Sequence, residues 1–178
     1  CLYLGNGLYL PVMKTRFDAY NIHRIKPELY WELDNHLRVL KEQPFVYNSP
    51  LIEKLPRDIP GIYTIGGGRQ IGKTTLLKQW IASLVAKNIS PQRITFFTGE
   101  LIDNHHILID LLAEQSVAIA DDTLQYIIID EVTYIKDWDR GIKFAADAGY
   151  LHKCIVVLTG SYLTLMQAAR MTFPGRRG

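Results

Sequence analysis

The sequence lacks the features that define several classes of protein. Its two cysteines, Cys1 and Cys154, lie at opposite ends of the chain, so neither a disulfide framework nor a cysteine-rich zinc site is expected. No apolar run approaches the roughly 20 residues that span a bilayer. The first twelve residues also lack the basic segment and cleavage site of a secretory signal. These absences predict a cytoplasmic protein with no membrane partner.

A surplus of charge of one sign is missing too. The chain has 20 Lys and Arg residues against 18 Asp and Glu residues, a formal net charge of +2. Such a balance gives no support for nucleic acid as a partner and does not suggest disorder. The 178 residues, 48% of them hydrophobic, suffice for one globular domain with a buried core.

The sequence does contain an alternation of apolar runs and amphipathic segments. Four apolar runs are typical of strands buried on both faces: 62–65, 94–98, 126–129 and 154–158. The segments between them have helical periodicity, around 76–85 and over 103–118 and 137–148. Strands that alternate with helices predict an α/β fold, a three-layer αβα sandwich with a mostly parallel sheet.

The chain divides into three parts: an N-terminal extension (1–26), a lead-in helix and loop (27–60), and the main domain (61–178). We expect part of the extension before Met13 to be non-native, because Met13 could be the natural start. Four leucines at helical spacing after Pro27 predict one helix that continues to Gln43. The chain stops at Gly178 in a loop-like run, so we expect a fragment of a longer protein, incomplete at its C-terminus.

The main domain contains a phosphate-binding pattern. Residues 67–74 read GGRQIGKT and match G-x-x-x-x-G-K-[ST], directly after a predicted strand and at the start of a predicted helix. Glycines let backbone N–H groups surround phosphate oxygens, and the helix N-terminus adds partial positive charge. Lys73 would reach the β- and γ-phosphates, and the Thr74 hydroxyl would bind Mg²⁺. The pattern predicts that the protein binds ATP and ADP with Mg²⁺.

Two acids follow the third predicted strand. Asp130 is placed to hold the Mg²⁺ shell, and Glu131 to activate the attacking water as a general base. Both would lie at the carboxyl end of a strand, where ligands bind in open α/β sheets. A Glu at this position favours hydrolytic ATPases over small-molecule kinases.

Two further groups of residues are weaker candidates. Thr159 and Ser161 follow the fourth predicted strand and could sense the γ-phosphate or orient water, although a turn that caps the next helix explains them equally well. Arg176 and Arg177 could act as an arginine finger, in cis or across a subunit contact, with a solvated basic tail as the alternative.

The predicted site has three sets of residues. The expected catalytic residues are Glu131, Lys73, Arg176 and Arg177. The expected metal ligands are Thr74 and Asp130. The residues expected to bind nucleotide are Gly67, Gly68, Arg69, Gln70, Ile71, Gly72, Lys73, Thr74, Thr75, Thr159 and Ser161.

Several segments in order resemble the prokaryotic AAA+-like P-loop ATPases that join an N-terminal ATPase domain to a C-terminal domain of unassigned function. The resemblance runs from about residue 27 to residue 178, through GGRQIGKTTLLKQ, ITFFTGELI, YIIIDEVTYIKDWDRGIKF, IVVLTGSYLTL and FPGRRG. It implies an AAA+/RecA-like fold, a sensor position at Thr159 to Ser161, and a C-terminal domain missing from this chain. Gly68 replaces a proline common in the family, and Gly66 replaces an arginine.

The leading hypothesis is an Mg²⁺-dependent ATPase that drives or switches an unidentified protein client. The alternatives are a nucleotide-dependent binding module without hydrolysis and, with less support, a P-loop kinase for a small molecule. An arginine finger supplied in trans would require a homo-oligomer. We expect the isolated chain to bind nucleotide better than it hydrolyses it.

Overall fold

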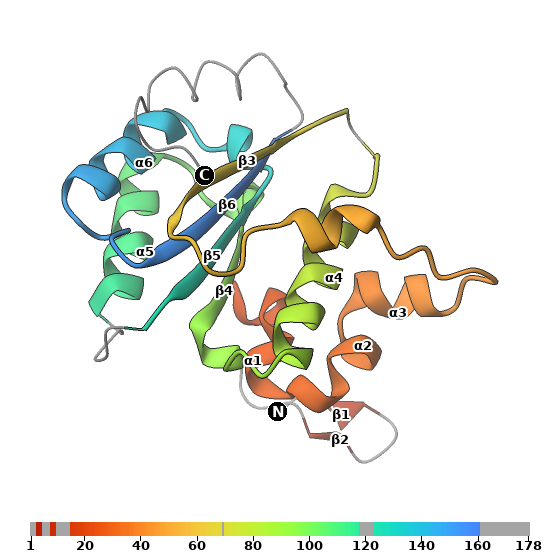
Figure 1. Cartoon of the computed structure of the whole chain (residues 1–178). Helices are drawn as coiled ribbons and strands as arrows, with labels where there is room; N and C mark the ends of the chain where they lie inside the picture. The colour runs from red at the N-terminus through yellow and green to blue at the C-terminus, as the bar shows by residue number, and fades with distance from the viewer. Residues whose placement is uncertain (1–2, 5–7, 10–14, 69, 118–122, 161–178) are drawn as a thin grey trace.

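The computed structural model describes residues 3–4, 8–9, 15–68, 70–117 and 123–160 (Figure 1). Its main sheet has four strands: β3 (Gly61–Gly66), β4 (Ile94–Thr98), β5 (Gln125–Asp130) and β6 (Cys154–Gly160). They pair in the order β3-β6-β5-β4, and every pair is parallel. The predicted α/β fold is therefore confirmed, and each predicted strand lies in this sheet.

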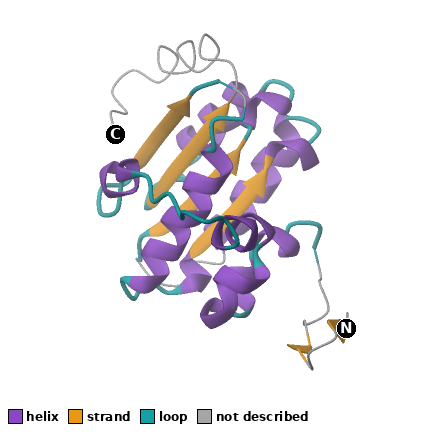
Figure 2. Ribbon diagram, turned by 90° about the vertical axis from the view of Figure 1, so that its right-hand side faces the viewer, coloured by secondary structure: helices purple, strands orange, loops and turns teal. Residues whose placement is uncertain are grey.

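Helices cover both faces of the sheet and give the molecule three layers (Figures 1 and 2). Helix α4 (Lys73–Ala86) lies on one face together with the shorter helices α1 (Ile22–Ile25), α2 (Tyr30–Leu33) and α3 (Asn35–Lys41). Helices α5 (His105–Val117) and α6 (Trp138–Asp147) cover the other face. No helix in the described ranges is both long enough and apolar enough to cross a membrane.

The remaining elements are short. Six of those in the described part of the chain are 3₁₀ helices: η1 (Asp18–Tyr20), η2 (Pro27–Leu29), η3 (Pro50–Lys54), η4 (Pro91–Arg93), η5 (Gly99–Leu101) and η6 (Val132–Tyr134). Near the N-terminus, β1 (Tyr3–Leu4) and β2 (Leu8–Tyr9) form an antiparallel pair.

The strands are apolar throughout because they contribute to two cores. Successive side chains of a strand point to opposite faces of the sheet. In β5, Ile127 and Ile129 pack against α5 and α6, whereas Tyr126 and Ile128 pack against α4. All four side chains are buried, so the fold needs apolar residues at every position of this strand.

The predicted helix between Pro27 and Gln43 is divided in two. Its backbone becomes extended at Asp34 (φ −74°, ψ 125°), and α3 begins at the next residue. The Asp34 carboxylate accepts hydrogen bonds from the backbone N–H groups of His36 (3.0 Å) and Leu37 (3.2 Å), and so caps α3. The leucine spacing continues across this break, so the periodicity alone could not reveal it.

The outer edge of β4 is covered by side chains of the N-terminal segment. The Asn21 amide donates to the carbonyl of Phe96 at 2.9 Å and accepts from the Phe96 N–H at 2.8 Å, as a neighbouring strand would. The His23 ring lies 3.0 Å from the carbonyl of Ile94. Covering an edge in this way satisfies its backbone groups and blocks pairing with another chain.

His23 makes the stability of the protein depend on pH. Burial lowers its pKa to about 4, because the charged imidazolium loses its hydration there. The unfolded chain binds this proton near pH 6.5, so the stability that neutral His23 contributes is present above pH 6.5 and falls as the pH drops toward 4. We expect His23 to account for a loss of about 3 kcal/mol over that range.

Urea denaturation at several pH values measures this effect. In the His23→Gln variant, which retains an amide donor, the unfolding free energy should fall by about 3 kcal/mol less between pH 7 and pH 4 than in the wild type. The His152→Gln variant is the control, because His152 is exposed and its removal should leave the pH dependence unchanged. Equal pH dependence in His23→Gln and the wild type would refute the assignment.

Candidate nucleotide site

The predicted phosphate loop connects β3 to α4. Gly72 adopts φ 83°, a left-handed conformation that residues with a side chain rarely adopt, and α4 begins at the next residue. Gly72 has no side chain to cap the helix, so the first N–H groups of α4 point toward the loop without a side-chain cap. Gln70 and Ile71 are exposed in the loop. The predicted order of strand, glycine-rich loop and helix is therefore present.

Lys73 lies where the loop ends and α4 begins, and two contacts hold its side chain. Its ammonium donates to the carbonyl of Gly68 at 2.8 Å and forms an ion pair with Glu131 Oε1 at 3.4 Å. The side chain is 5% exposed, whereas that of Glu131 is 21% exposed. A phosphate oxygen that approached the loop would therefore compete with a carbonyl and a carboxylate for this cation.

Thr74 and Asp130 are brought together from α4 and the end of β5. The Thr74 hydroxyl donates to Asp130 Oδ2 at 2.6 Å, and Asp130 is buried. A carboxylate and a hydroxyl are hard oxygen ligands of the kind that Mg²⁺ prefers. Thr74 directly follows Lys73 at the start of α4, so the donor set fits a magnesium ion that also contacts bound phosphates.

Glu131 follows Asp130 in a left-handed backbone conformation (φ 53°, ψ 47°). This conformation costs about 1–2 kcal/mol for a residue other than glycine, so its surroundings must support it. The N–H of Glu131 donates to Thr159 Oγ1 at 2.9 Å. The sharp turn directs the chain away from the sheet and places the carboxylate beside Lys73.

Gly99 is a site residue that the sequence analysis missed. It follows β4, whose last residue Thr98 pairs in register with Asp130. A Cβ atom at Gly99 would lie 2.3 Å from the carbonyl oxygen of Glu131, closer than any side chain can approach. The sequence shows a glycine directly after a predicted strand. Its contact with the acidic pair could be predicted only by knowing that β4 and β5 are neighbours in the sheet.

The structure places the predicted residues as follows. It brings together Lys73, Thr74, Asp130, Glu131 and Thr159 at the carboxyl ends of β3, β5 and β6. Thr75 is half-buried in the first turn of α4. Arg69, Ser161, Arg176 and Arg177 lie outside the described residues.

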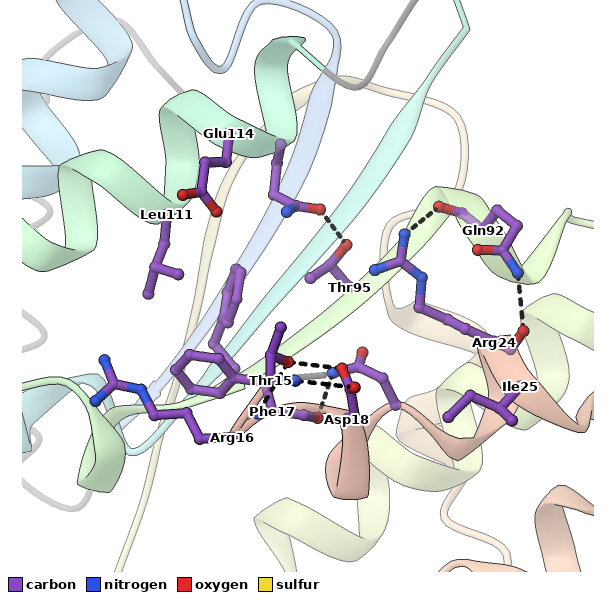
Figure 3. Close-up of a pocket in the computed structure, with 13 residues that line it drawn as sticks. Thr15, Arg16, Phe17, Asp18, Arg24, Ile25, Gln92, Thr95, Leu111 and Glu114 are labelled. Atoms are coloured by element: carbon purple, nitrogen blue, oxygen red, sulfur yellow. Dashed lines mark hydrogen bonds between the residues drawn. The ribbon is translucent and has the colours of Figure 1, made fainter. Parts of the chain in front are cut away.

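A cavity of about 600 Å³ lies at the β4 edge, and none of its lining residues belongs to the phosphate loop (Figure 3). The rings of Phe17 and Phe97 line it, with their centroids 5.0 Å apart. Across its wall the Thr95 hydroxyl donates to Gln115 at 2.7 Å. The side chains of Thr95 and Gln115 are therefore already paired with each other.

The family model for the AAA domain matches residues 60–178, more than half of the chain. The chain belongs to this family. The match begins directly before β3 and contains every strand of the parallel sheet together with the five clustered residues. Membership indicates a nucleotide-dependent, ATPase-like activity and confirms the resemblance for this domain, whereas the C-terminal domain stays a prediction. No curated protein matches the chain.

Proposed function

We propose that this AAA domain binds ATP with Mg²⁺ and hydrolyses the β–γ bond to drive or switch a protein client. The observation that carries the proposal is that Asp130 and Glu131 contact Thr74 and Lys73, the first two residues of α4. A cation, an oxygen pair for a metal and a carboxylate for water are the groups that such a hydrolysis requires.

Binding is the first task of these residues. The N–H groups at the start of α4 and the Lys73 ammonium would hold the phosphates, with Gly72 giving the backbone its turn. Thr74 and Asp130 would hold Mg²⁺, which when bound neutralises charge on the phosphates. Phosphate binding would replace the contacts of Lys73 with Gly68 and Glu131.

The second task is to activate water. Once phosphate oxygens engage Lys73, the Glu131 carboxylate exchanges its ammonium contact at 3.4 Å for a contact with water. It would orient a water molecule toward the γ-phosphate and take its proton, while the terminal phosphoryl group leaves ADP. The ion pair thus favours activation of water after nucleotide has bound.

Other features of the proposal rest on the sequence alone. The cytoplasmic location, assembly into a homo-oligomer, an arginine finger at Arg176 or Arg177 and a further C-terminal domain are predictions. A binding module without hydrolysis is the alternative that the first experiment separates from an ATPase.

The first experiment measures binding of ATP and ADP and Mg²⁺-dependent release of phosphate by this chain. The Lys73→Ala variant should bind ATP about 10- to 100-fold more weakly, because it loses charge-assisted contacts to phosphate. The Lys87→Ala variant removes an exposed lysine just past the other end of α4 and should bind as the wild type does.

Each result has a definite meaning. ATP binding that depends on Lys73, with phosphate release that needs Mg²⁺, supports the ATPase. Tight binding of ATP without any release of phosphate would indicate a nucleotide-dependent binding module instead of an ATPase. Binding that Lys73→Ala does not weaken would overturn the assignment of the site.

A further inference from the structure

Thr159 occupies a central position among the site residues. It is the second-last residue of β6, and its side chain is fully buried. Its hydroxyl donates to Asp130 Oδ1 and accepts from the N–H of Glu131 at 2.9 Å. A hydroxyl has one proton to donate, and here that proton is directed to Asp130. One side chain therefore contacts both members of the acidic pair.

The two contacts fix different parts of the acidic pair. Because Thr74 donates to Asp130 Oδ2 and Thr159 to Oδ1, hydroxyl groups from α4 and β6 orient both oxygens of this carboxylate. The contact to Glu131 is with the backbone, at the residue whose φ is 53°. The orientation of the metal ligand and the turn at Glu131 thus depend on the same hydroxyl group.

The opposite side of the turn is closed by Gly99. The space for a Cβ at Gly99 is taken by the backbone of Glu131 and by the carbonyl of Asp130, which would lie 3.3 Å away. The turn after β5 is therefore held between its two neighbouring strands, by the hydrogen bond that Glu131 donates to β6 and by close packing against Gly99, the residue after β4.

We propose that Thr159 is a positioning residue, which acts on bound nucleotide through Asp130 and Glu131 and makes no contact with the phosphates itself. This inference rests on the proposed function, because it assigns the metal to Asp130 and the water to Glu131. It differs from the expectation that Thr159 senses the γ-phosphate directly, since complete burial and two engaged hydrogen bonds keep its hydroxyl within the protein.

The test compares Thr159→Val, which keeps the shape of the side chain without the hydroxyl, with Thr159→Ser, which keeps the hydroxyl. We expect Thr159→Val to lower kcat for ATP hydrolysis about 10- to 100-fold, the usual effect of losing an outer-shell partner of a metal ligand. The Kd for ATP without metal should change less than about 3-fold, because the phosphate contacts come from α4 and Lys73. Thr159→Ser should recover most of kcat.

A matched control separates positioning from general stability. Thr95 is also a buried threonine in the sheet, and its hydroxyl bonds to Gln115 at the β4 edge. The Thr95→Val variant should lower the unfolding free energy as Thr159→Val does and leave kcat unchanged. A parallel loss of kcat in both variants would show that Thr159 acts only through stability.

A second measurement does not need hydrolysis. The affinity of the ADP complex for Mn²⁺, followed by electron paramagnetic resonance, should fall about 10-fold in Thr159→Val, since Asp130 loses its orientation. Wild-type protein that binds Mn²⁺ and ADP but releases no phosphate would refute the proposed hydrolysis and leave this comparison valid. Thr159→Val that matches the wild type in both measurements, or that loses ATP affinity without metal, would overturn the positioning role.

Discussion

Replacing Glu131 with Gln should nearly stop phosphate release while the protein still binds ATP. The amide keeps the size of the carboxylate and cannot accept the proton of the attacking water. Loss of a general base typically costs about 10²- to 10⁴-fold in rate, so we expect kcat to fall within that range. Measurement of phosphate release in a single turnover, with ATP binding measured on the same sample, tests this result.

The same substitution should also raise the affinity for ATP. Glu131 Oε1 lies 3.4 Å from the Lys73 ammonium, and a bound phosphate must replace that contact. A neutral amide competes less well for the cation, so we expect the Kd for ATP to fall about 2- to 5-fold, the value of a partly exposed ion pair. A variant that lost turnover without gaining affinity would show that the ion pair does not oppose binding.

The control for both effects is Glu114→Gln. Glu114 is an exposed acid that lines the cavity at the β4 edge. It lies in the last turn of α5, whereas the first turn of this helix is the one that follows the carboxyl end of β4. Its replacement changes the net charge by the same amount and should leave both kcat and Kd at their wild-type values. If Glu131→Gln hydrolysed ATP at the wild-type rate, Glu131 would not be the general base.

The sequence was most informative where a local pattern carries the structure. Buried parallel strands need apolar residues at every position, so the apolar runs marked all four strands of the main sheet. The phosphate loop was recognisable because its residues are close in sequence. Gly72 makes the turn before α4, and Lys73 is the first residue of that helix. The acidic pair was recognisable because it ends such a strand.

The contacts that join distant segments could not be predicted in this way. Asn21 and Phe96 are separated by 75 residues, and neither has neighbours that suggest the hydrogen bonds between them. The contact of Gly99 with Glu131 needs the order of β4 and β5 in the sheet, which alternating strands and helices do not specify. Short helices such as α1 bury too few side chains to produce a visible period.

The largest expected effect on stability comes from a pair of this long-range kind. Lys78 on α4 lies 3.0 Å from the carboxylate of Asp34, and both side chains are almost completely buried. The ammonium also donates to the carbonyl of Tyr20 at 2.8 Å and lies 4.0 Å from the centre of the Phe96 ring. Burial lowers the pKa of Lys78, and the nearby Asp34 carboxylate opposes that shift.

We expect Asp34→Asn to lower the unfolding free energy by about 3–5 kcal/mol, because it leaves a buried ammonium without its counter-charge. The amide oxygen can still accept from the N–H groups of His36 and Leu37, so the cap of α3 is retained. Urea denaturation measures the change. The double variant Asp34→Asn with Lys78→Met should recover much of the loss, since it removes both charges and keeps the volume of the lysine chain.

The exposed pair of Lys41 and Glu32 provides the matched control. Its N–O distance is 2.7 Å, but the two side chains are 57% and 47% exposed. Removing it with Glu32→Gln should cost less than about 1 kcal/mol, because water already screens both charges. Equal losses at the buried and the exposed pair would contradict the argument from burial.

The pH dependence of the Asp34→Asn variant gives a further check on the cause. Without the carboxylate, the pKa of Lys78 in the folded protein should fall further below that in the unfolded chain, whose value is 10.5. Between those two pKa values the unfolded chain binds more protons, so the stability of the variant should rise with pH. If the stability of Asp34→Asn does not rise with pH, the buried charge of Lys78 is not the cause of the lost stability. Lys78 and Lys73 both lie on α4, so a stable pair of Lys78 and Asp34 holds the phosphate-binding end of this helix against the N-terminal helices.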